Sequence, residues 1–308
     1  MLYDLIIIGG GPAGSAAAVY AGRKHLKSLM LVYEFGGQSI VSEDIQNWIG
    51  TVSLSGQELA KNFKKHVETY SKDFVVIKEG EKAIKIEKDK DIFKIKTDQN
   101  NEYVTKTILI TTGSNRRKLK IEGAKKFENK GITYCASCDG PMFAEKDVAV
   151  IGGGNAGFET AVQLLAYAKS VTLLDIEENY KADKITIDKV LANPKMTGIS
   201  NAEIIKINGD QFVTGLIYKN KKIGEEKTLK VEGIFVEIGQ IPNTETVKNL
   251  LELDEYNRIK IDFKNQKTSL EGIWSAGDCT NVLYHQNNIA AGDGVRALED
   301  IYLYLHAK

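Results

Sequence analysis

Short aliphatic runs, each followed by glycines and then by a helical pattern, recur along the chain. Residues 3–8 contain the continuous aliphatic run 5–8, which predicts a buried parallel strand. Gly9–Gly14 follow, and the small, alanine-rich residues 15–24 predict a helix before a strand at 28–32. The order returns as a strand at 148–151, glycines at 152–157, a helix at 158–168 and a strand at 170–174. This repetition predicts two parallel sheets with crossover helices, an α/β fold.

Elsewhere the pattern of apolar and polar residues predicts an amphipathic helix and several short strands. Residues 57–70 place apolar side chains on one face of a predicted helix, and the lysine-rich stretch 74–106 predicts short antiparallel strands with one wet face. Residues 208–230 read as a hairpin that turns at 220–222. Further strands are expected at 107–112, 233–238, 259–261 and 272–275, and a last helix at 288–305.

Composition and charge narrow the class of protein. The chain has 308 residues, enough for two domains with separate cores. Its 41 basic and 41 acidic residues cancel, so we expect no nucleic-acid partner. The apolar runs are far shorter than the roughly 20 residues of a membrane span. Three cysteines do not make a secreted disulfide framework, so we expect a cytoplasmic protein.

The first glycine run carries a dinucleotide-binding pattern. Gly9, Gly11 and Gly14 fit G-x-G-x-x-G between a strand and a helix, with Pro12 and Ala13 inside it. The first glycine allows the tight turn, the second lets backbone approach a pyrophosphate, and the third lets the helix pack on the strand. Glu34 follows Gly14 by twenty residues, where an acid accepts hydrogen bonds from a ribose. A merely structural glycine turn is the alternative.

The second glycine run repeats the pattern. Gly152, Gly154 and Gly157 again fit G-x-G-x-x-G, with Asn155 inside it, and Asp175 comes eighteen residues after Gly157. The sequence therefore predicts a second nucleotide site. The glycine-rich turn at 36–37 suits backbone lying close to a ligand. Glycine and proline at 239–242 indicate the return crossing between the domains, and Asp278 lies at the carboxyl end of a predicted strand, where open α/β sheets bind ligands.

Two thiols lie between these patterns, at Cys135 and Cys138, with Asp139 directly after the second. Cys-x-x-Cys at a helix start brings the sulfurs together and favours redox chemistry. A structural zinc site needs four ligands, and only Cys279 and four scattered histidines remain. We therefore predict no metal, with inert packing as a minor alternative, and we expect Cys279 to be a buried core residue.

With these motifs in this order, the chain resembles the low-molecular-weight thioredoxin reductases from end to end. Cys279 and the stretch 173–183 look more like the flavoprotein subunit of alkyl hydroperoxide reductase. That subunit carries an extra N-terminal dithiol domain, which we do not expect because the first pattern begins at Gly9. The resemblance implies two Rossmann-like, three-layer ββα domains, with 117–243 inserted between 1–116 and 244–308.

The resemblance also implies FAD in the first site and a nicotinamide nucleotide in the second. The implied FAD-binding residues are Gly9, Gly11, Pro12, Ala13, Gly14, Glu34, Gly37, Gln38, Asn47, Gly113, Gly277, Asp278 and Gln286. Those implied for the nicotinamide nucleotide are Gly152, Gly154, Asn155, Gly157, Asp175 and Gly239. For Asn47, a plain turn former is an equally good interpretation.

The implied reaction passes electrons from the nicotinamide through FAD to a Cys135–Cys138 disulfide. By resemblance Cys138 faces the flavin, Cys135 attacks the partner's disulfide and Asp139 handles the proton, although a helix cap is the alternative for Asp139. The implied partner is a thioredoxin- or glutaredoxin-like protein, which could in turn feed a peroxiredoxin, and the implied assembly is a homodimer. Because the inserted domain carries both the dithiol and the nicotinamide site, we expect a hinge rotation to alternate them at one flavin.

The electron donor is expected to be NADH. Thioredoxin reductases usually place arginines around the 2′-phosphate of NADPH, but here residues 175–181 read DIEENYK, and no arginine occurs between Lys118 and Asn257. An acid favours a free 2′-hydroxyl, and only Lys181 and Lys184 could compensate. Three alternatives stay open: an NADPH-dependent thioredoxin reductase, an NADH oxidase or ferredoxin-linked flavoenzyme, and a non-catalytic redox sensor.

Overall fold

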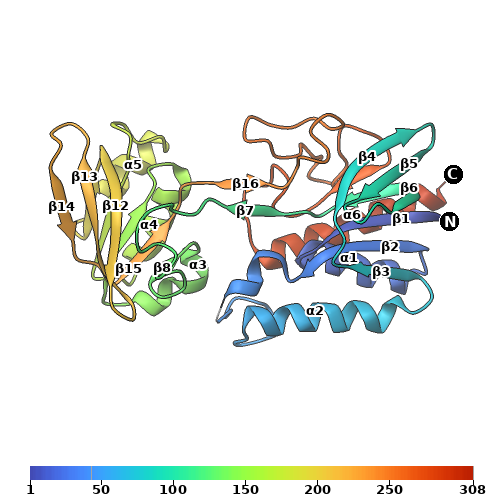
Figure 1. Ribbon diagram of the computed structural model, residues 1–308, viewed down its shortest axis with the longest axis horizontal. Coiled ribbons are helices and arrows are strands. Elements are labelled where there is room, and N and C mark those ends of the chain that lie inside the picture. Colours follow the sequence, from blue (N-terminus) through green and yellow to red (C-terminus); the bar gives the residue numbers. More distant parts are fainter. Residues whose placement is uncertain (43, 308) are drawn as a thin grey trace. The chain divides into compact units, whose positions relative to one another are not determined.

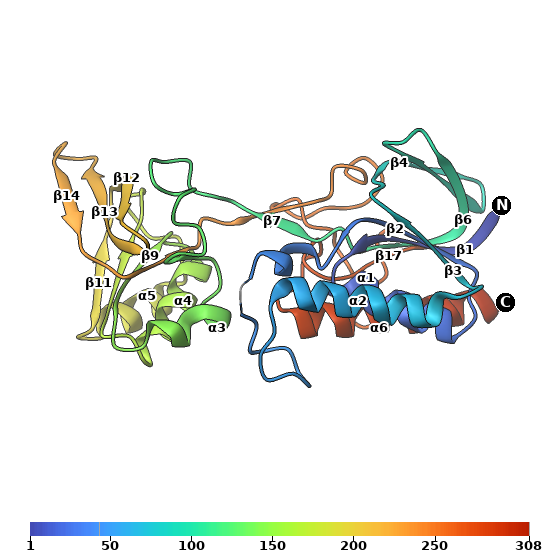
Figure 2. The ribbon, with the colours of Figure 1, turned by 60° about the horizontal axis from the view of Figure 1, so that its bottom comes forward.

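The computed structural model describes residues 1–42 and 44–307. The chain divides into two compact units, one made of residues 1–115 and 241–308 and the other of residues 116–240. Each unit contains a mainly parallel sheet between two further layers (Figures 1 and 2). The expected α/β class with two Rossmann-like sheets is confirmed. The assignment of a cofactor to each unit remains a prediction.

The first unit begins with β1 (Leu2–Gly10), α1 (Pro12–Arg23) and β2 (Ser28–Phe35). The elements that follow are the 3₁₀ turn Gly37–Val41, α2 (Gly56–Ser71), β3 (Val75–Glu79), β4 (Ala83–Asp89), β5 (Ile92–Thr97), β6 (Glu102–Ile110), β17 (Ile273–Ser275) and α6 (Asn287–His306). The short strands β7 (Ser114–Arg116) and β16 (Gln240–Pro242) each span a boundary between the two units. The sheet order is β3-β2-β1-β6-β5-β4, and β17 pairs with β6.

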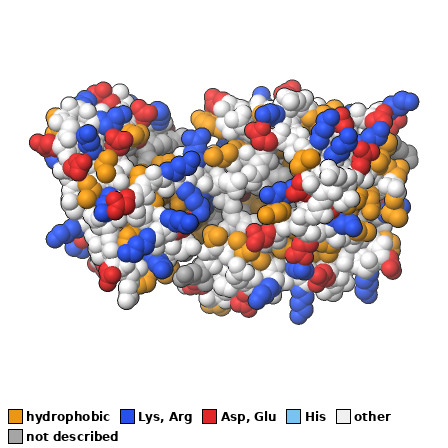
Figure 3. Space-filling model, viewed as in Figure 1, with side chains coloured by type: hydrophobic (Ala, Val, Ile, Leu, Met, Phe, Trp, Pro, Cys, Tyr) orange, Lys and Arg blue, Asp and Glu red, His pale blue; other side chains and the backbone are white. Residues whose placement is uncertain are grey.

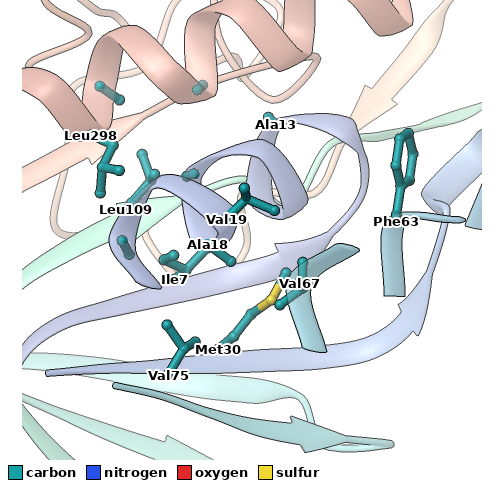
Figure 4. Close-up of a cluster of buried hydrophobic side chains, with 14 of the residues drawn as sticks. Ile7, Ala13, Ala18, Val19, Met30, Phe63, Val67, Val75, Leu109 and Leu298 are labelled. Carbon is teal, nitrogen blue, oxygen red and sulfur yellow. The ribbon is translucent and has the colours of Figure 1, made fainter. Parts of the chain in front are cut away.

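Local sequence explains the helices of this unit. Ser55 caps α2 by accepting the Glu58 backbone N–H at 3.1 Å, and Leu59, Phe63 and Val67 bury one face of that helix. Helices α1, α2 and α6 cover one face of the sheet (Figure 2). Ile7, Met30 and Leu109 of the strands pack against Ala18, Val67 and Leu298 of the helices (Figure 4). The other face packs against β4, β5 and the loops between 247 and 282.

Two sequence expectations for this unit are wrong. β3 does not belong to an antiparallel group, because it pairs in parallel with β2. It follows α2 in a β–α–β crossover, and a helical crossover returns the chain in the same direction. Residues 259–261 form no strand: Ile259 makes only isolated bridges with Leu253 and Thr280. Such a short apolar run is buried without a neighbouring strand long enough for a ladder.

The second unit comprises β8 (Ile132–Thr133), α3 (Ala136–Asp139), the 3₁₀ turn Gly140–Phe143, β9 (Asp147–Ile151), α4 (Asn155–Leu165), β10 (Ser170–Leu174), α5 (Lys184–Leu191), β11 (Met196–Ile199), β12 (Ala202–Gly209), β13 (Val213–Asn220), β14 (Glu226–Leu229) and β15 (Gly233–Val236). Its parallel sheet has the order β11-β10-β9-β15-β8. Helices α3, α4 and α5 pack on one face and the β12-β13-β14 sheet on the other. The expected hairpin turn lies between β13 and β14, whereas β12 and α5 were not expected.

Both chain crossings between the units are extended, and they pair as the two-stranded ribbon β7–β16. Acidic and basic side chains are interspersed over the face shown in Figure 3. Among the described residues, no helix combines the length and the apolar character that a membrane span requires.

Candidate functional site

The first glycine loop lies at the carboxyl end of β1. Gly9 has a φ of +124°, and a Cβ there would overlap the Thr111 carbonyl oxygen. A Cβ on Gly14 would overlap the Gly9 carbonyl, so α1 can approach β1 only without that atom. Gly11, in contrast, caps α1 and faces open space, with no atom within 4 Å of the Cβ position. The loop therefore presents bare backbone and a helix N-terminus to an anionic ligand.

Further polar residues surround this loop at the same edge of the sheet. Glu34 is exposed near the end of β2, and Gly36 donates its N–H to the Gly10 carbonyl at 2.9 Å. Gln38 donates to Ser114 Oγ at 3.1 Å. The structure thus brings the end of β2, the glycine loop and the segment after β6 together, and binding of a nucleotide by them remains a prediction.

Loops that are distant in the sequence complete this edge. Asn47 Nδ2 donates to Gln286 Oε1 at 3.2 Å, joining two expected flavin-site residues that lie 239 positions apart. Gly277 has a φ of +80°, and its Cβ position is 3.4 Å from Ala13 Cβ, so it lies against the first turn of α1. Asp278 follows, with its Oδ1 3.4 Å from His285 Nδ1. Sequence pattern alone did not indicate this contact between Asp278 and His285.

Hydrogen bonds of Asn243 join the segment where the chain leaves the first unit to the segment where it returns. Gly113 has a φ of +65° and accepts the Asn243 backbone N–H at 3.0 Å. The Asn243 side chain also donates to the Thr112 carbonyl at 2.9 Å. In the second unit Gly239 has a φ of +98° and accepts the Arg117 N–H at 3.1 Å. Both expected glycines therefore lie at backbone turns.

The second glycine loop repeats the contacts of the first. Gly152 has a φ of +120°, and a Cβ on Gly157 would overlap the Gly152 carbonyl. Gly154 caps α4 and has open space where its Cβ would be. Asn155 Oδ1 accepts the Asp183 N–H at 2.9 Å, which ties the loop to the segment after β10.

Asp175 packs against Gly153 in this second loop. Its side chain is 8% exposed, and its Oδ2 occupies the space where Gly153 would carry a Cβ. Burial, and then the Asp175 charge, raise the pKa of Tyr180, whose ring also lies against Gly153. The Lys181 N–H donates to the Gly153 carbonyl at 2.8 Å. Residues 175–181 therefore fold back over the glycine loop, which spacing alone did not predict.

The charges of this segment are largely paired. Lys181 Nζ lies 3.4 Å from Glu177, and Lys222 of the β13–β14 turn forms an ion pair with Glu178. Lys222 is a cation that the sequence interpretation missed, since it is 44 residues from its partner. Within residues 1–42 and 44–307, no Lys or Arg is within ion-pair distance of Asp175. An acidic group thus remains where a ribose is expected.

Cys135 and Cys138 form a disulfide at the start of α3, with their Cα atoms 5.3 Å apart. Both residues are half-buried, and the Cys138 N–H donates to the Cys135 carbonyl at 3.3 Å. The exposed Ser137 between them donates to Gln163 of α4 at 2.8 Å. The expected redox pair is therefore held on the helical face of the second unit, next to the helix that starts at the glycine loop.

Asp139 lies at the end of α3, and its carboxylate accepts a hydrogen bond from Thr133 Oγ1. The same hydroxyl accepts the Cys135 N–H at 3.4 Å. Asp139 occupies the N-cap position of the 3₁₀ turn that follows, but its side chain makes no capping hydrogen bond to that turn. The helix-cap alternative therefore gains no support from this position. Thr133 was missed by the sequence interpretation, although it lies only two residues before the first cysteine.

Cys279 is fully buried, and its Sγ lies 3.4 Å from Ser275 Oγ, as expected for a core residue. Burial raises the pKa of its thiol. Among the described residues, no group of three or more His, Cys, Asp or Glu side chains could hold a metal ion.

Comparison with known proteins defines the class. Residues 3–294 match the pyridine nucleotide-disulphide oxidoreductase family, and the chain belongs to that family. Membership implies FAD and a pyridine nucleotide as cofactors, and the two open glycine loops fit such groups.

Individual relatives show which members of the family the chain is similar to. The chain is 37% identical over 303 residues to an NADH dehydrogenase of Bacillus subtilis (strain 168), and 37% identical over 304 residues to the F-subunit of alkyl hydroperoxide reductase from Escherichia coli (strain K12). Each alignment covers 98% of this chain but only 58% of the relative, so the chain spans little more than half their length. The crystal structure of a thioredoxin reductase from Streptococcus pyogenes MGAS5005 superposes with a TM-score of 0.90 at 33% identity, covering 100% of this chain and 99% of that one.

Proposed function

We propose that this protein is a flavoenzyme that passes electrons from NADH, through FAD, to the Cys135–Cys138 disulfide and on to a thioredoxin- or glutaredoxin-like protein. The observation that carries the proposal is a disulfide in the same compact unit as a second dinucleotide loop. Bound FAD supplies two-electron transfer between a nicotinamide and a disulfide. The likeness to a thioredoxin reductase over the whole chain supports the thiol acceptor.

The residues of the first unit would hold the flavin nucleotide. The Gly9–Gly14 loop and the α1 N-terminus offer backbone N–H groups to the pyrophosphate, and Glu34 accepts from the ribose. Asn47 and Gln286, already joined by a hydrogen bond, would line the far part of the cofactor together with Asp278. In the second unit, Gly152–Gly157 and Asp175 would bind the nicotinamide nucleotide in the same way.

The dithiol chemistry then follows from the cysteines. The Cys135 thiolate attacks one sulfur of the partner's disulfide, forming a mixed disulfide and releasing the other sulfur as a thiolate. Cys138 attacks Cys135, which restores the intramolecular disulfide and releases the partner's second thiolate. Two electrons leave the enzyme, and the partner gains two protons. Asp139, held by Thr133, is placed beside the cysteines to carry one of them.

Counting electrons tests this proposal. Anaerobic titration of the purified protein should consume two NADH per chain, one for the flavin and one for the disulfide. Cys135→Ser and Cys138→Ser should each consume one. Cys279→Ser, a matched control at the third cysteine, should still consume two because that thiol is buried and unpaired with another cysteine. Uptake of one NADH by the unaltered protein would contradict the relay.

The same variants separate the alternatives. A Cys138→Ser protein that keeps full activity with its acceptors would indicate an NADH oxidase or a ferredoxin-linked flavoenzyme. Bleaching of the flavin by NADH, followed by reduction of a small redoxin that depends on the dithiol, would exclude a non-catalytic redox sensor.

NADH is proposed over NADPH as the donor. Buried Asp175 favours a free 2′-hydroxyl and repels a 2′-phosphate, and a relative covering 98% of this chain is named an NADH dehydrogenase. Steady-state kcat/KM for the two nucleotides decides the matter, and a tenfold preference for NADPH would overturn the proposal.

The partner proposals extend this reaction. The relative named as the F-subunit of alkyl hydroperoxide reductase supports a peroxiredoxin downstream of the redoxin. Oxidation of NADH should then depend on hydroperoxide when the enzyme, a redoxin and a peroxiredoxin are combined. If the protein is a homodimer, as we propose, light scattering should give twice the mass of one chain. Alternation of two domain orientations remains a prediction, and a crosslink that blocks reorientation should prevent multiple turnover.

A further inference from the structure

Glu237 occupies a position at the second nucleotide loop that the proposed function does not use. It directly follows β15, and its N–H donates to the Ile151 carbonyl at the end of β9 at 2.8 Å. A Cβ on Gly152 would overlap the Glu237 carbonyl oxygen. The Glu237 backbone therefore packs directly against the second glycine loop.

The Glu237 side chain is directed toward α4. Its Oε1 accepts a hydrogen bond from Thr160 Oγ1 at 2.9 Å, from the second turn of the helix. Burial raises the pKa of Glu237 to about 7, although Arg116 and Thr160 lower it; Glu159 raises it further. These charged groups lie on β7 and α4, the elements that face the carboxyl group.

The sheet order indicates which part of a dinucleotide would meet Glu237. From β9, the chain proceeds to β10 and β11 on one side and reaches β15 and β8 on the other. A dinucleotide crosses such a switch point at the carboxyl ends of the strands. Asp175 after β10 marks the adenosine side, so the nicotinamide half extends over β15, where Glu237 lies.

We propose that Glu237 makes nucleotide binding sensitive to the charge of the nicotinamide ring, because the oxidised ring is a cation and the reduced ring is neutral. An ionised Glu237 beside the ring stabilises bound NAD⁺ and leaves bound NADH nearly unaffected. NAD⁺ binding is therefore linked to loss of the Glu237 proton, whereas NADH binding is not. This inference rests on the proposed nicotinamide site in the second unit.

The proton balance is simple. Below neutral pH, when NAD⁺ binds to a protein molecule whose Glu237 is protonated, Glu237 becomes a carboxylate and its one proton passes to solvent. No electron moves in this step. A shift of one unit in the Glu237 pKa on binding releases roughly half a proton per NAD⁺ near pH 6.5 and makes NAD⁺ bind about tenfold tighter at high pH than at low pH.

Calorimetric titration of the oxidised holoenzyme tests the linkage. NAD⁺ is compared with 1,4,5,6-tetrahydro-NAD, whose neutral ring donates no hydride, at pH 6 to 8 in buffers of different ionisation enthalpy. The difference in protons released should be about half a proton near pH 6.5 and vanish at high pH. The ratio of the two dissociation constants should change about tenfold. A ratio independent of pH in the unaltered protein would overturn the inference.

Variants identify the titrating group. Glu237→Gln should remove the difference in proton release while both nucleotides still bind. Thr160→Val should move the transition to higher pH and Glu159→Gln to lower pH, because Thr160 lowers and Glu159 raises the Glu237 pKa. Linkage that persists in Glu237→Gln would refute the assignment. Failure of either nucleotide to bind the unaltered protein would instead contradict the proposed function.

Discussion

Replacing Asp175 by asparagine should reduce the proposed preference for NADH over NADPH. The carboxylate lies over Gly153, and its Oδ1 accepts the Glu177 N–H at 3.3 Å. Asparagine has the same shape and keeps an oxygen for that hydrogen bond, so the segment should retain its course. What changes is the charge. The acids at 177 and 178 are already paired with Lys181 and Lys222, so Asp175 supplies the uncompensated negative charge.

The expected magnitude follows from that charge. A 2′-phosphate bound where Asp175 meets the ribose would place like charges about 4 Å apart. Such a pair repels by about 1 kcal/mol in water and roughly 4 kcal/mol near a protein surface. Asp175 is only 8% exposed, but residues 176–179 beside it are exposed, so solvent favours the lower part of the range. We expect the ratio of kcat/KM for NADH over NADPH to fall by about 10- to 100-fold, equivalent to about 1.4–2.8 kcal/mol.

The assay is steady-state reduction of a redoxin with each nucleotide, together with flavin reduction in a stopped-flow instrument. Asp147→Asn is the matched control, since it makes the same change at the amino end of β9, beside Lys169 and away from the loop. It should leave the ratio unchanged. An unchanged ratio in Asp175→Asn would show that this carboxylate does not face the 2′ position.

Four further substitutions test separate parts of the structure. Gly157→Ala should abolish NADH binding at retained flavin content, while Gly14→Ala should lose flavin on purification, because each added Cβ overlaps the carbonyl that the helix rests on. Thr133→Val should slow redoxin reduction at least fivefold, since a hydrogen bond to the charged Asp139 contributes about 1.5–3 kcal/mol, and stopped-flow reduction of the flavin by NADH should stay unchanged. Glu81→Gln should lower the free energy of unfolding by about 1–2 kcal/mol at pH 7 and by less at pH 4. Although burial raises the Glu81 pKa, three hydrogen bonds outweigh it and lower the pKa, so its stabilisation is present above pH 4.5 and lost as the pH falls; urea titration at both pH values checks this.

The sequence predicted the parts of the fold that local pattern encodes. Gly9–Gly14 and Gly152–Gly157 impose a turn, a close helix contact and an open helix N-terminus within six residues. The strand and helix on each side therefore follow from the same stretch. Cys135 and Cys138 are equally local, because three residues at a helix start bring their side chains together.

The missed features depend on contacts between distant segments. β3 looked like the first strand of a meander, and only its pairing with β2 makes it parallel. Lys222 reaches Glu178 from a hairpin turn, and Glu237 meets Thr160 across 77 positions. For Glu237 a sequence signal was present, since it is an acid near the carboxyl end of the expected strand 233–238, as Asp278 is near the end of the expected strand 272–275.

The position of Asp175 over Gly153 has a consequence for redesign of this enzyme. Tyr180 and the Lys181 backbone contact the same glycine, so the stretch proposed to select the nucleotide is attached to the loop proposed to bind its pyrophosphate. Grafting an arginine-rich segment in place of 175–181 would remove the Tyr180 ring contact and could change the backbone course that aims the residue-181 N–H at the Gly153 carbonyl. Point changes that keep the Lys181 hydrogen bond should therefore convert the donor at a smaller loss of affinity than a transplanted loop of the same charge.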